Sequence, residues 1–392
     1  MSSTIAVLGP VDVPSLAPWL RTSGVPTANL PRGRPATAVT RLVDGLLQHT
    51  SCSLAVITLD FAVSRPATIR SDRLIVRVCP LRRRHRARDM FRAERTFMQE
   101  ALEELSPALV HANWTYEYAL AALAYGGTSL LTVRDWAPTI LRHDRTPYRA
   151  ARLIMNIKAI SRAPNLVASS PYIAERLERW KRRSIDFIPG GIDDALFFPR
   201  EREDTPKLRE ILAVNNGFSQ FKNVGNLLRA YSRVRASLEE TRLRLVGTGY
   251  EPNGTAQIWA RSRGLDEGVI FHGSASQAEL VTLYRRAALL VHPSREESFG
   301  NVLVEAMSQG LPVIGGRDSG AVPWVLGFGQ AGRLVDVSSP VAISDAICEI
   351  LADNSEWRRL SDSGYQRSHR EFRSSVTSGR YANIYSSLIE GR

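Results

Sequence analysis

Two glutamates eight positions apart, Glu297 and Glu305, form the most informative pattern in this sequence. An apolar run at residues 288–291 precedes them, and helix-like spacing follows from residue 301 to residue 309. We therefore expect a strand that ends near residue 293, a loop that carries Glu297, and a helix with Glu305 on its face. The residues between the two acids that could touch a ligand are Ser298, Phe299, Gly300 and Asn301.

This arrangement predicts an anion site with a carboxylate at either side. Gly300 lets the backbone approach a ligand closely, because glycine has no side chain to obstruct it. The helix that begins at Asn301 would direct free N–H groups at that ligand, and such an end suits phosphate. A molecule with hydroxyls at both ends and phosphates in the middle fits this description, and a sugar nucleotide is such a molecule.

The same segment resembles the Glu-x7-Glu motif of the family 4 retaining glycosyltransferases, which belong to glycosyltransferase group 1 and have the GT-B fold. The resemblance covers most of the chain and is strongest from residue 270 to residue 316. It implies that Glu297 is the catalytic residue that contacts the donor sugar near the reacting carbon, and that Glu305 holds the ribose hydroxyls. The alternative is an amphipathic helix with two solvated acids. The flanking Pro-Ser, Phe-Gly and Gly-Leu-Pro-Val elements favour the family.

Lys222 is the second candidate for donor binding. It lies in a polar loop between an expected strand and an expected helix, and the resemblance implies that it binds the donor diphosphate. The alternative is a surface lysine. The family usually has an arginine five or six residues earlier, where this chain has Asn216 and Gly217. Two alternatives are open: Asn216 donates a neutral hydrogen bond to the donor in place of that charge, or an arginine from elsewhere in the chain supplies the charge.

Three further candidates lie in the first half of the chain. Gly33, followed by Arg34, resembles the glycine loop that in the family lies across the cleft from the donor phosphates. Arg134 stands where the family often has a histidine, and it cannot shuttle protons at neutral pH. It could pair with phosphate or an acidic acceptor, or simply with its neighbour Asp135. Trp114 could stack on an acceptor sugar or belong to the core.

Strand and helix signals alternate twice along the chain, which predicts parallel sheets covered on both faces. The fold class is therefore α/β, and the resemblance specifies GT-B: two doubly wound Rossmann-like domains that face each other across a cleft. We place an acceptor-binding domain at residues 1–188, rejoined by a last helix at about 376–392, and a nucleotide-sugar-binding domain at residues 189–375. The expected strands are 4–8, 54–59, 74–78, 109–112, 129–133, 166–168, 211–214, 243–246, 269–271 and 311–314.

The composition of the chain indicates where in the cell the protein works and which partners its charge could attract. The chain has no expected signal peptide or membrane-spanning run, and its three cysteines lack metal spacing, which favours a cytoplasmic protein. The formal charge of +12 is almost all arginine. It is explained by a solvated basic face, by contact with an anionic membrane or lipid-diphosphate acceptor, or by nucleic acid. No nucleic-acid module is recognised, so we expect no nucleic-acid partner. A solvated face is the simplest explanation, and the alternative is peripheral contact with the inner face of the membrane through Arg82, Arg83, Arg84 and Arg86.

The function we expect is transfer of a sugar from a nucleoside-diphosphate sugar to a hydroxyl acceptor, in polysaccharide, lipid-linked glycan or natural-product glycosylation. No Asp-x-Asp pair is present, so we expect no metal cofactor; Lys222 and helix N-termini would neutralise the phosphates. Two alternatives stay open: a GT-B sugar-nucleotide epimerase, and an inactive GT-B scaffold that serves as a partner subunit. The departures at Asn216 and Arg134 give the scaffold some weight.

Overall fold

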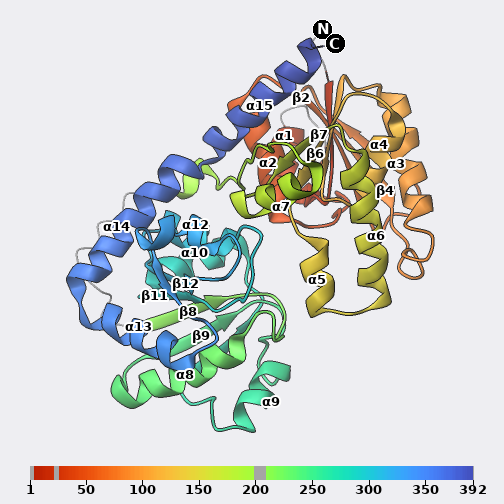
Figure 1. Cartoon of the computed structure of the whole chain (residues 1–392). Coiled ribbons are helices and arrows are strands. Elements are labelled where there is room, and N and C mark those ends of the chain that lie inside the picture. Colours follow the sequence, from red (N-terminus) through yellow and green to blue (C-terminus); the bar gives the residue numbers. More distant parts are fainter. Residues whose placement is uncertain (1–3, 22–25, 198–208, 392) are drawn as a thin grey trace. The chain divides into compact units, whose positions relative to one another are not determined.

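The computed structural model describes residues 4–21, 26–197 and 209–391. The chain divides into two compact units (Figure 1). The first contains the described residues up to Asp193 together with those from Ser374 onward, and the second runs from Asp194 to Arg373. The last stretch of chain thus returns to the unit in which the chain begins.

The first unit is built on a seven-stranded sheet in the order β3-β4-β2-β1-β5-β6-β7. All pairings are parallel except that of β3 with β4. Without β3, the order along the chain is 3-2-1-4-5-6, that of a doubly wound dinucleotide-binding sheet. The strands are β1 (Thr4–Leu8), β2 (Ser53–Asp60), β3 (Ala67–Arg70), β4 (Leu74–Pro80), β5 (Leu109–Asn113), β6 (Ser129–Val133) and β7 (Asn165–Ala168).

Helices cover both faces of this sheet because successive strand residues point to opposite sides. In β1, Ile5 and Val7 pack in one apolar cluster with α2 and α15, whereas Ala6 and Leu8 pack in another with α3, α4 and α6. Figure 1 shows α2 and α15 side by side on one face. The helices are α1 (Ala17–Arg21), α2 (Thr37–His49), α3 (Arg92–Leu105), α4 (Glu117–Tyr125), α5 (Ala137–His143), α6 (Pro147–Arg162), α7 (Pro171–Lys181) and α15 (Ser374–Glu390).

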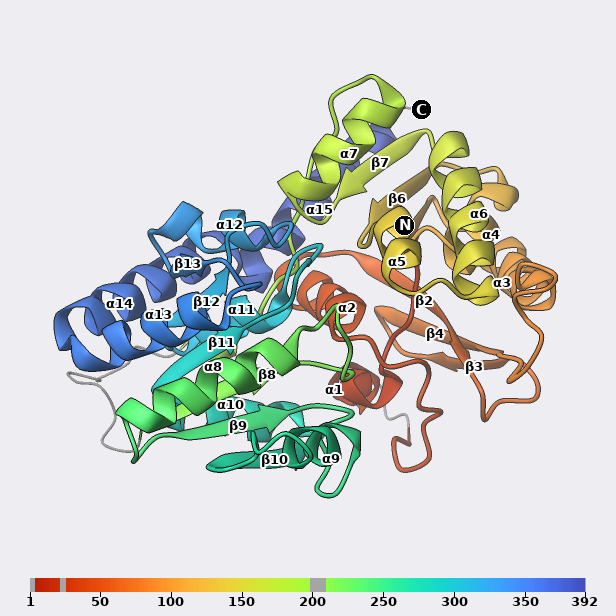
Figure 2. The same ribbon diagram turned by 60° about the horizontal axis from the view of Figure 1, so that its bottom comes forward.

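The second unit repeats the same topology. Its six strands are all parallel and run in the order β10-β9-β8-β11-β12-β13, again 3-2-1-4-5-6 along the chain (Figure 2). The strands are β8 (Glu210–Val214), β9 (Arg242–Val246), β10 (Val269–Gly273), β11 (Leu289–His292), β12 (Val313–Gly316) and β13 (Arg333–Val335). The helices are α8 (Val224–Ser237), α9 (Thr255–Arg261), α10 (Gln277–Arg286), α11 (Asn301–Ser308), α12 (Val322–Val325), α13 (Pro340–Ala352) and α14 (Asn354–Glu371).

The two parallel-dominated sheets confirm the predicted α/β, doubly wound class. The strand β3 was not predicted, because none of its four residues is buried and its apolar pattern is weak. Helix α3 begins at Arg92, directly after Phe91, whose backbone is left-handed (φ 59°). Among the described residues, no helix combines the length and the apolar character needed to cross a bilayer.

Candidate functional site

The candidate site lies where the connections of the second sheet diverge. β8 and β11 are neighbours in that sheet, but the chain leaves β8 toward β9 on one side and β11 toward β12 on the other. Such a switch point leaves a crevice beyond the carboxyl ends of the strands, where open α/β sheets bind ligands. Lys222 follows β8 and Glu297 follows β11, so the topology brings the two predicted residues to the same place.

Lys222 and Glu297 form an ion pair there. The Lys222 Nζ atom donates to Glu297 Oε1 over 2.6 Å, and His292 Nε2 lies 3.1 Å from the same oxygen. The Glu297 side chain is 16% exposed and that of Lys222 is 21% exposed, so both remain open to a ligand. The carboxylate is thus held by a cation and by an imidazole at the end of β11.

The environment keeps Glu297 ionised. Burial by itself raises the pKa of this carboxyl, but the Lys222 charge and the His292 hydrogen bond outweigh burial and hold the pKa well below its usual range. Because the folded pKa is lowered, Glu297 is a carboxylate throughout the physiological pH range. It is suited to balance positive charge and not to donate a proton.

The backbone of Glu297 is fixed from both sides. Its N–H donates to Ser319 O over 3.3 Å, and its carbonyl accepts from Ala321 N over 2.9 Å. Gly320, between these partners, has φ +65°, and a Cβ there would come within 2.4 Å of the Glu297 carbonyl oxygen. Only glycine therefore fits at this close approach.

Lys222 is positioned by its neighbour Asn223. Asn223 has a left-handed backbone (φ 57°) and stands at the N-cap position of α8, where its side chain makes no capping hydrogen bond. Its buried amide donates to Pro293 O over 3.1 Å and to Val337 O over 2.7 Å, which ties the lysine loop to the loop after β11. Sequence reasoning missed both Asn223 and His292. His292 could have been found from its place at the end of an apolar strand, five residues before the glutamate.

The predicted helix N-terminus is present. α11 begins at Asn301 after Gly300, which has φ +93° and no side-chain cap. Ser298 is partly buried in the loop before it. Phe299 is buried, and its ring lies 5.6 Å from that of Phe372, so its side chain belongs to an aromatic cluster and only its backbone lies at the helix start.

Glu305 lies in the second turn of α11. Its side chain is buried, and Glu305 Oε2 accepts a hydrogen bond from the Tyr284 hydroxyl over 2.9 Å. Tyr284 itself is fully buried on α10. The hydroxyl thus fixes the orientation of the carboxylate.

Asn216 joins the loops that follow β8 and β9. Its side-chain oxygen accepts from Thr248 N over 3.1 Å, and Gly217 N donates to Thr248 O over 2.8 Å. Gly247 has φ +123°, and a Cβ there would overlap the Asn215 carbonyl oxygen at 1.8 Å. Asn216 is exposed, and in this structure it holds the loop pair together.

The remaining candidates lie in the first unit. Gly33 is buried, with φ +70°, and its N–H donates to Asp60 Oδ2 over 2.8 Å. Trp114 is partly buried and packs against both apolar clusters of its unit, and its backbone has φ 65°. Arg34 forms an ion pair with the buried Glu117, at 3.1 Å between Nη1 and Oε1.

Arg134 does not pair with Asp135, the simplest of its predicted partners. Arg134 Nε donates to Asn113 Oδ1 over 2.8 Å, at the carboxyl end of β5. Both carboxylate oxygens of Asp135 instead accept from the Tyr116 hydroxyl at 3.0 Å. Burial raises the pKa of Asp135 to about 6, although Arg152 and the Tyr116 hydrogen bond oppose that rise.

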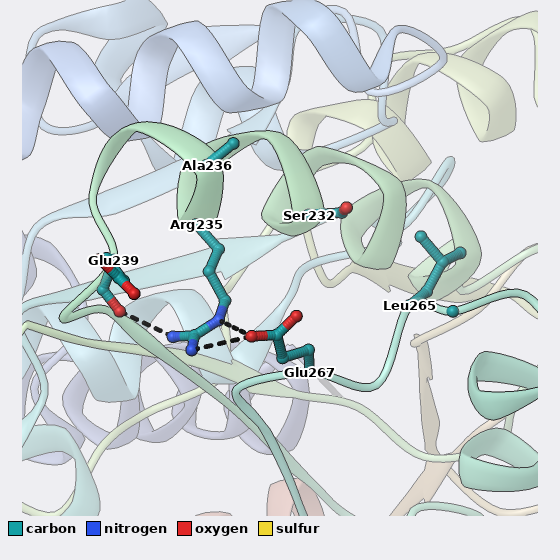
Figure 3. Close-up of a pocket in the computed structure, with 7 residues that line it drawn as sticks. Ser232, Arg235, Ala236, Glu239, Leu265 and Glu267 are labelled. Atoms are coloured by element: carbon teal, nitrogen blue, oxygen red, sulfur yellow. Dashed lines mark hydrogen bonds and ion pairs between the residues drawn. The ribbon is translucent and has the colours of Figure 1, made fainter.

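A pocket at the other end of the second unit contains none of the predicted site residues. Figure 3 shows Arg235, near the end of α8, paired with Glu267 and donating to the Glu239 carbonyl. The last turn of α8 lies toward the amino ends of the strands. Ligands of open parallel sheets bind at the carboxyl ends, so this pocket is not the candidate site.

Two family profiles match adjoining parts of the chain. Residues 197–367 match the family described as Glycosyl transferases group 1. Residues 36–196 match the one described as Glycosyltransferase Family 4. The chain belongs to the group 1 glycosyltransferases. The second match covers most of the unit that contains Gly33 and Arg134, and the first covers the unit that contains Lys222 and Glu297.

Individual group 1 glycosyltransferases and their relatives are similar to this chain at low identity. N-acetyl-alpha-D-glucosaminyl L-malate synthase of Bacillus anthracis is 27% identical over 213 residues, 53% of this chain and 55% of that protein. D-inositol 3-phosphate glycosyltransferase of Corynebacterium glutamicum is 28% identical over 219 residues, 52% of each chain. The matched region therefore spans about half the length of these curated relatives.

Solved structures share the fold of this group 1 glycosyltransferase along its whole length. Sucrose-phosphate synthase from Thermosynechococcus elongatus aligns with a TM-score of 0.79 at 20% identity and covers 100% of both chains. Alr3699/HepE of Anabaena, in complex with UDP and glucose, aligns with a TM-score of 0.71 at 16% identity and covers 98% of this chain and 100% of that one. The fold is GT-B, as the resemblance implied.

Proposed function

We propose that this protein is a retaining glycosyltransferase that moves a sugar from a nucleoside-diphosphate sugar to a hydroxyl of an acceptor. The observation that carries the proposal is the Lys222–Glu297–His292 cluster at the switch point of the second sheet. It combines an ionised carboxylate with an ammonium beside the start of a helix. A sugar nucleotide needs these two charges, one for its reacting carbon and the other for its diphosphate.

The donor would bind along the carboxyl edge of the second sheet. Lys222 would turn from Glu297 to the diphosphate, which also meets the uncapped N–H groups at the start of α11. Glu305, oriented by Tyr284, would accept hydrogen bonds from the ribose hydroxyls. The neighbour solved with UDP and glucose supports a uridine nucleotide as one donor to test.

The reaction would proceed by charge separation in a prepared site. As the bond to the diphosphate breaks, Glu297 would stabilise positive charge on the anomeric carbon while Lys222 and α11 stabilise the leaving group. The leaving phosphate would take the proton of the acceptor hydroxyl on the same face of the sugar, which gives retention. We assign no covalent nucleophile. Because Lys222 and α11 supply the positive charge, we propose that no metal ion is needed.

A ligand panel followed by product analysis tests this proposal. UDP, GDP, dTDP and ADP would each be added to the protein, and the matching nucleotide should raise the melting temperature, since it binds the folded state only. The sugar nucleotide of that base is then incubated with candidate acceptors, with and without EDTA. Anomeric coupling constants of the product distinguish retention from inversion. No thermal shift with any nucleotide would contradict the proposal, and conversion of the donor without an acceptor would favour epimerisation.

The acceptor class is part of the proposal. The names of two relatives contain L-malate and D-inositol 3-phosphate, both anionic molecules with hydroxyl groups. Other relatives, such as the lipopolysaccharide core glycosyltransferase LpsE of Rhizobium meliloti, are named for glycan synthesis. We therefore keep a polar small molecule and a lipid-linked glycan as acceptors to test.

Contact with an anionic membrane would involve fewer arginines than the sequence suggested. Arg82 is bound to Asp89 and Glu94 by ion pairs of 2.8 and 2.7 Å, and Arg86 donates to backbone carbonyls of its own loop. Arg83 and Arg84 are exposed. We propose that these two meet the lipid headgroups. Cosedimentation with vesicles containing phosphatidylglycerol should weaken when both are changed to glutamate, and unchanged sedimentation would exclude this surface.

A further inference from the structure

Arg134 is a partly buried cation without an acidic partner. Its Nε donates to the neutral Asn113 side chain over 2.8 Å, and no carboxylate within the described part of the chain forms an ion pair with it. Burial lowers the pKa of Arg134, although the nearby Tyr381 and Tyr385 hydroxyls oppose this effect. A guanidinium withdrawn from water is costly unless an anion balances it.

Two acids of this region, Asp135 and Glu117, are already occupied by other partners. Asp135 is bound through both oxygens to the Tyr116 hydroxyl. Glu117 is shared between Arg34 and Arg152, at 3.1 and 3.2 Å. The two carboxylates of this region are thus fixed in contacts that leave Arg134 out.

Asn113 provides a second, independent observation. It is fully buried at the end of β5, and its oxygen is used by Arg134, but its Nδ2 atom has no hydrogen-bond partner among the described residues. Such a buried donor is uncommon, because leaving it unpaired costs roughly 1–3 kcal/mol. β5 is also the strand beside β1 at the switch point of the first sheet, the place where that sheet would bind a ligand.

We propose that Arg134, oriented by Asn113, binds an anionic group of the acceptor, a phosphate or a carboxylate. This inference rests on the proposed function and names the acceptor's chemical class. An oxyanion accepts from the guanidinium fork and from the free amide N–H together, and it satisfies the charge and the donor at once.

An anion at Arg134 has two possible sources, the acceptor and the donor diphosphate. The donor already has an ammonium and a helix N-terminus in the second unit, at Lys222 and α11. Arg134 lies in the first unit, whose sheet has a switch point of its own. We therefore assign the Arg134 anion to the acceptor, and the experiment separates the two sources.

Phosphate binding in the presence of nucleotide tests the assignment. The full chain is saturated with the nucleoside diphosphate that stabilises it best, so that the donor diphosphate subsite is filled. Inorganic phosphate is then titrated by calorimetry into wild type, Arg134→Gln and Arg134→Lys. Arg142→Gln, which removes an exposed arginine of the same unit, is the matched control.

We expect Arg134→Gln to weaken phosphate binding by about 10- to 100-fold, the loss for one charge-assisted contact. Arg134→Lys should be intermediate because it keeps the charge but loses the fork, and Arg142→Gln should match wild type. Nucleotide affinity should stay the same in all variants. Phosphate binding that is absent in wild type, or unchanged in Arg134→Gln, overturns the proposal. Weaker nucleotide binding in Arg134→Gln overturns it too, because the anion would then be the donor's.

Two controls keep the result clear. The melting temperature of Arg134→Gln, measured without ligand, shows whether this variant folds. If it does not fold, the phosphate affinity of Arg134→Lys tests the proposal instead. Failure of the proposed function appears separately, as a wild-type protein that binds no nucleoside diphosphate at all.

Discussion

The two units have sheets of the same strand order but different chemistry at their switch points. In the second unit, Lys222 and Glu297 compensate each other directly, over 2.6 Å. In the first unit, Arg134 has neutral neighbours, the Asn113 amide and the Tyr381 hydroxyl, and among the described residues the Asn113 amide nitrogen has no hydrogen-bond partner. Topology determines where each unit can bind a ligand, whereas the side chains determine which ligand it binds.

The contrast assigns different tasks to the two sites. A paired cluster is stable without ligand and can exchange one partner for another, as Lys222 would when a diphosphate arrives. A cation that has only neutral hydrogen-bond partners, as Arg134 has among the described residues, gains an anionic partner from a ligand, so it favours an anionic ligand.

The largest effect is expected at Glu297. Glu297→Ala removes the carboxylate that balances charge on the reacting carbon, and we expect a fall in kcat of about a thousandfold, the scale of lost electrostatic stabilisation. The transfer rate at saturating donor is the measurement. Glu296→Ala, one residue earlier in the same loop, is the matched control. If Glu297→Ala turned over at a near-normal rate with an unchanged melting temperature, the switch point of the second sheet would have no part in the reaction.

Lys222 should act mainly on the donor. Lys222→Gln removes one charge-assisted contact to the diphosphate, so we expect nucleoside-diphosphate affinity to fall by about 10- to 100-fold. Lys222→Arg should recover only part of it, because a fork does not replace a compact ammonium. Both affinities can be measured by calorimetry. Phosphate affinity measured at Arg134 under nucleotide saturation should not change, and a parallel loss there would mean that the two sites are one.

A pH profile sharpens the role of the ion pair. Lys222 and His292 lower the Glu297 pKa, so the wild-type carboxylate stays ionised as the pH falls. In Lys222→Gln the chief opposing charge is gone, and burial then raises that pKa. At saturating donor, the kcat of this variant should decline at a higher pH than that of wild type. If kcat declined at the same acidic pH in both proteins, Lys222 would not control the pKa of Glu297.

Gly320 should help to hold the Glu297 backbone in place, because it leaves room for the Glu297 carbonyl. A Cβ at Gly320 would come within 2.4 Å of the Glu297 carbonyl and would also need a positive φ. We expect Gly320→Ala to cost about 1–3 kcal/mol of stability and to displace Glu297. Melting temperature and kcat report the two effects. Gly264→Ala, which has φ +64° but no atom within 4 Å of the added carbon, separates backbone strain from the clash.

The sequence predicted the second site better than the first for a physical reason. Glu297, Gly300 and Glu305 lie within one strand–loop–helix segment, so local spacing alone places them around a helix start. Lys222 could be found because it lies between a strand and a helix. Gly320 could not, since its requirement comes from a contact with the Glu297 backbone that only the folded sheet creates.

The first site depends on contacts between distant segments. Arg134 and its neighbour Asp135 suggested a simple pair, but Tyr116 takes the aspartate and Asn113 takes the arginine. These partners come from β5 and the loop after it, beside β6 in the sheet. No periodicity in the sequence specifies that choice, because it depends on the direction in which each side chain leaves its strand end.

The smallest effect is expected where α15, the last helix, packs on β5 within the first unit. His111 on β5 is fully buried, with Nδ1 at 2.6 Å from the Tyr385 hydroxyl of α15 and Nε2 at 2.7 Å from Thr132 Oγ1. Tyr385→Phe leaves one ring nitrogen unpaired and should cost about 1–2 kcal/mol. Thermal unfolding and hydrogen exchange of β5 amides measure this loss. Tyr125→Phe is the control, because the Tyr125 hydroxyl makes no hydrogen bond within the described part of the chain.

The buried His111 also makes the stability of the folded protein depend on pH. Burial lowers the His111 pKa to about 3, whereas in the unfolded chain it stays near its ordinary 6.5. Below pH 6.5 the unfolded state therefore takes up a proton that the folded state refuses, and stability is lost progressively from about pH 6.5 toward pH 3. His111→Gln should flatten this part of the pH dependence, although it lowers stability at neutral pH. An acid slope that is unchanged in His111→Gln would show that other groups cause it, and that α15 is held by packing more than by this network.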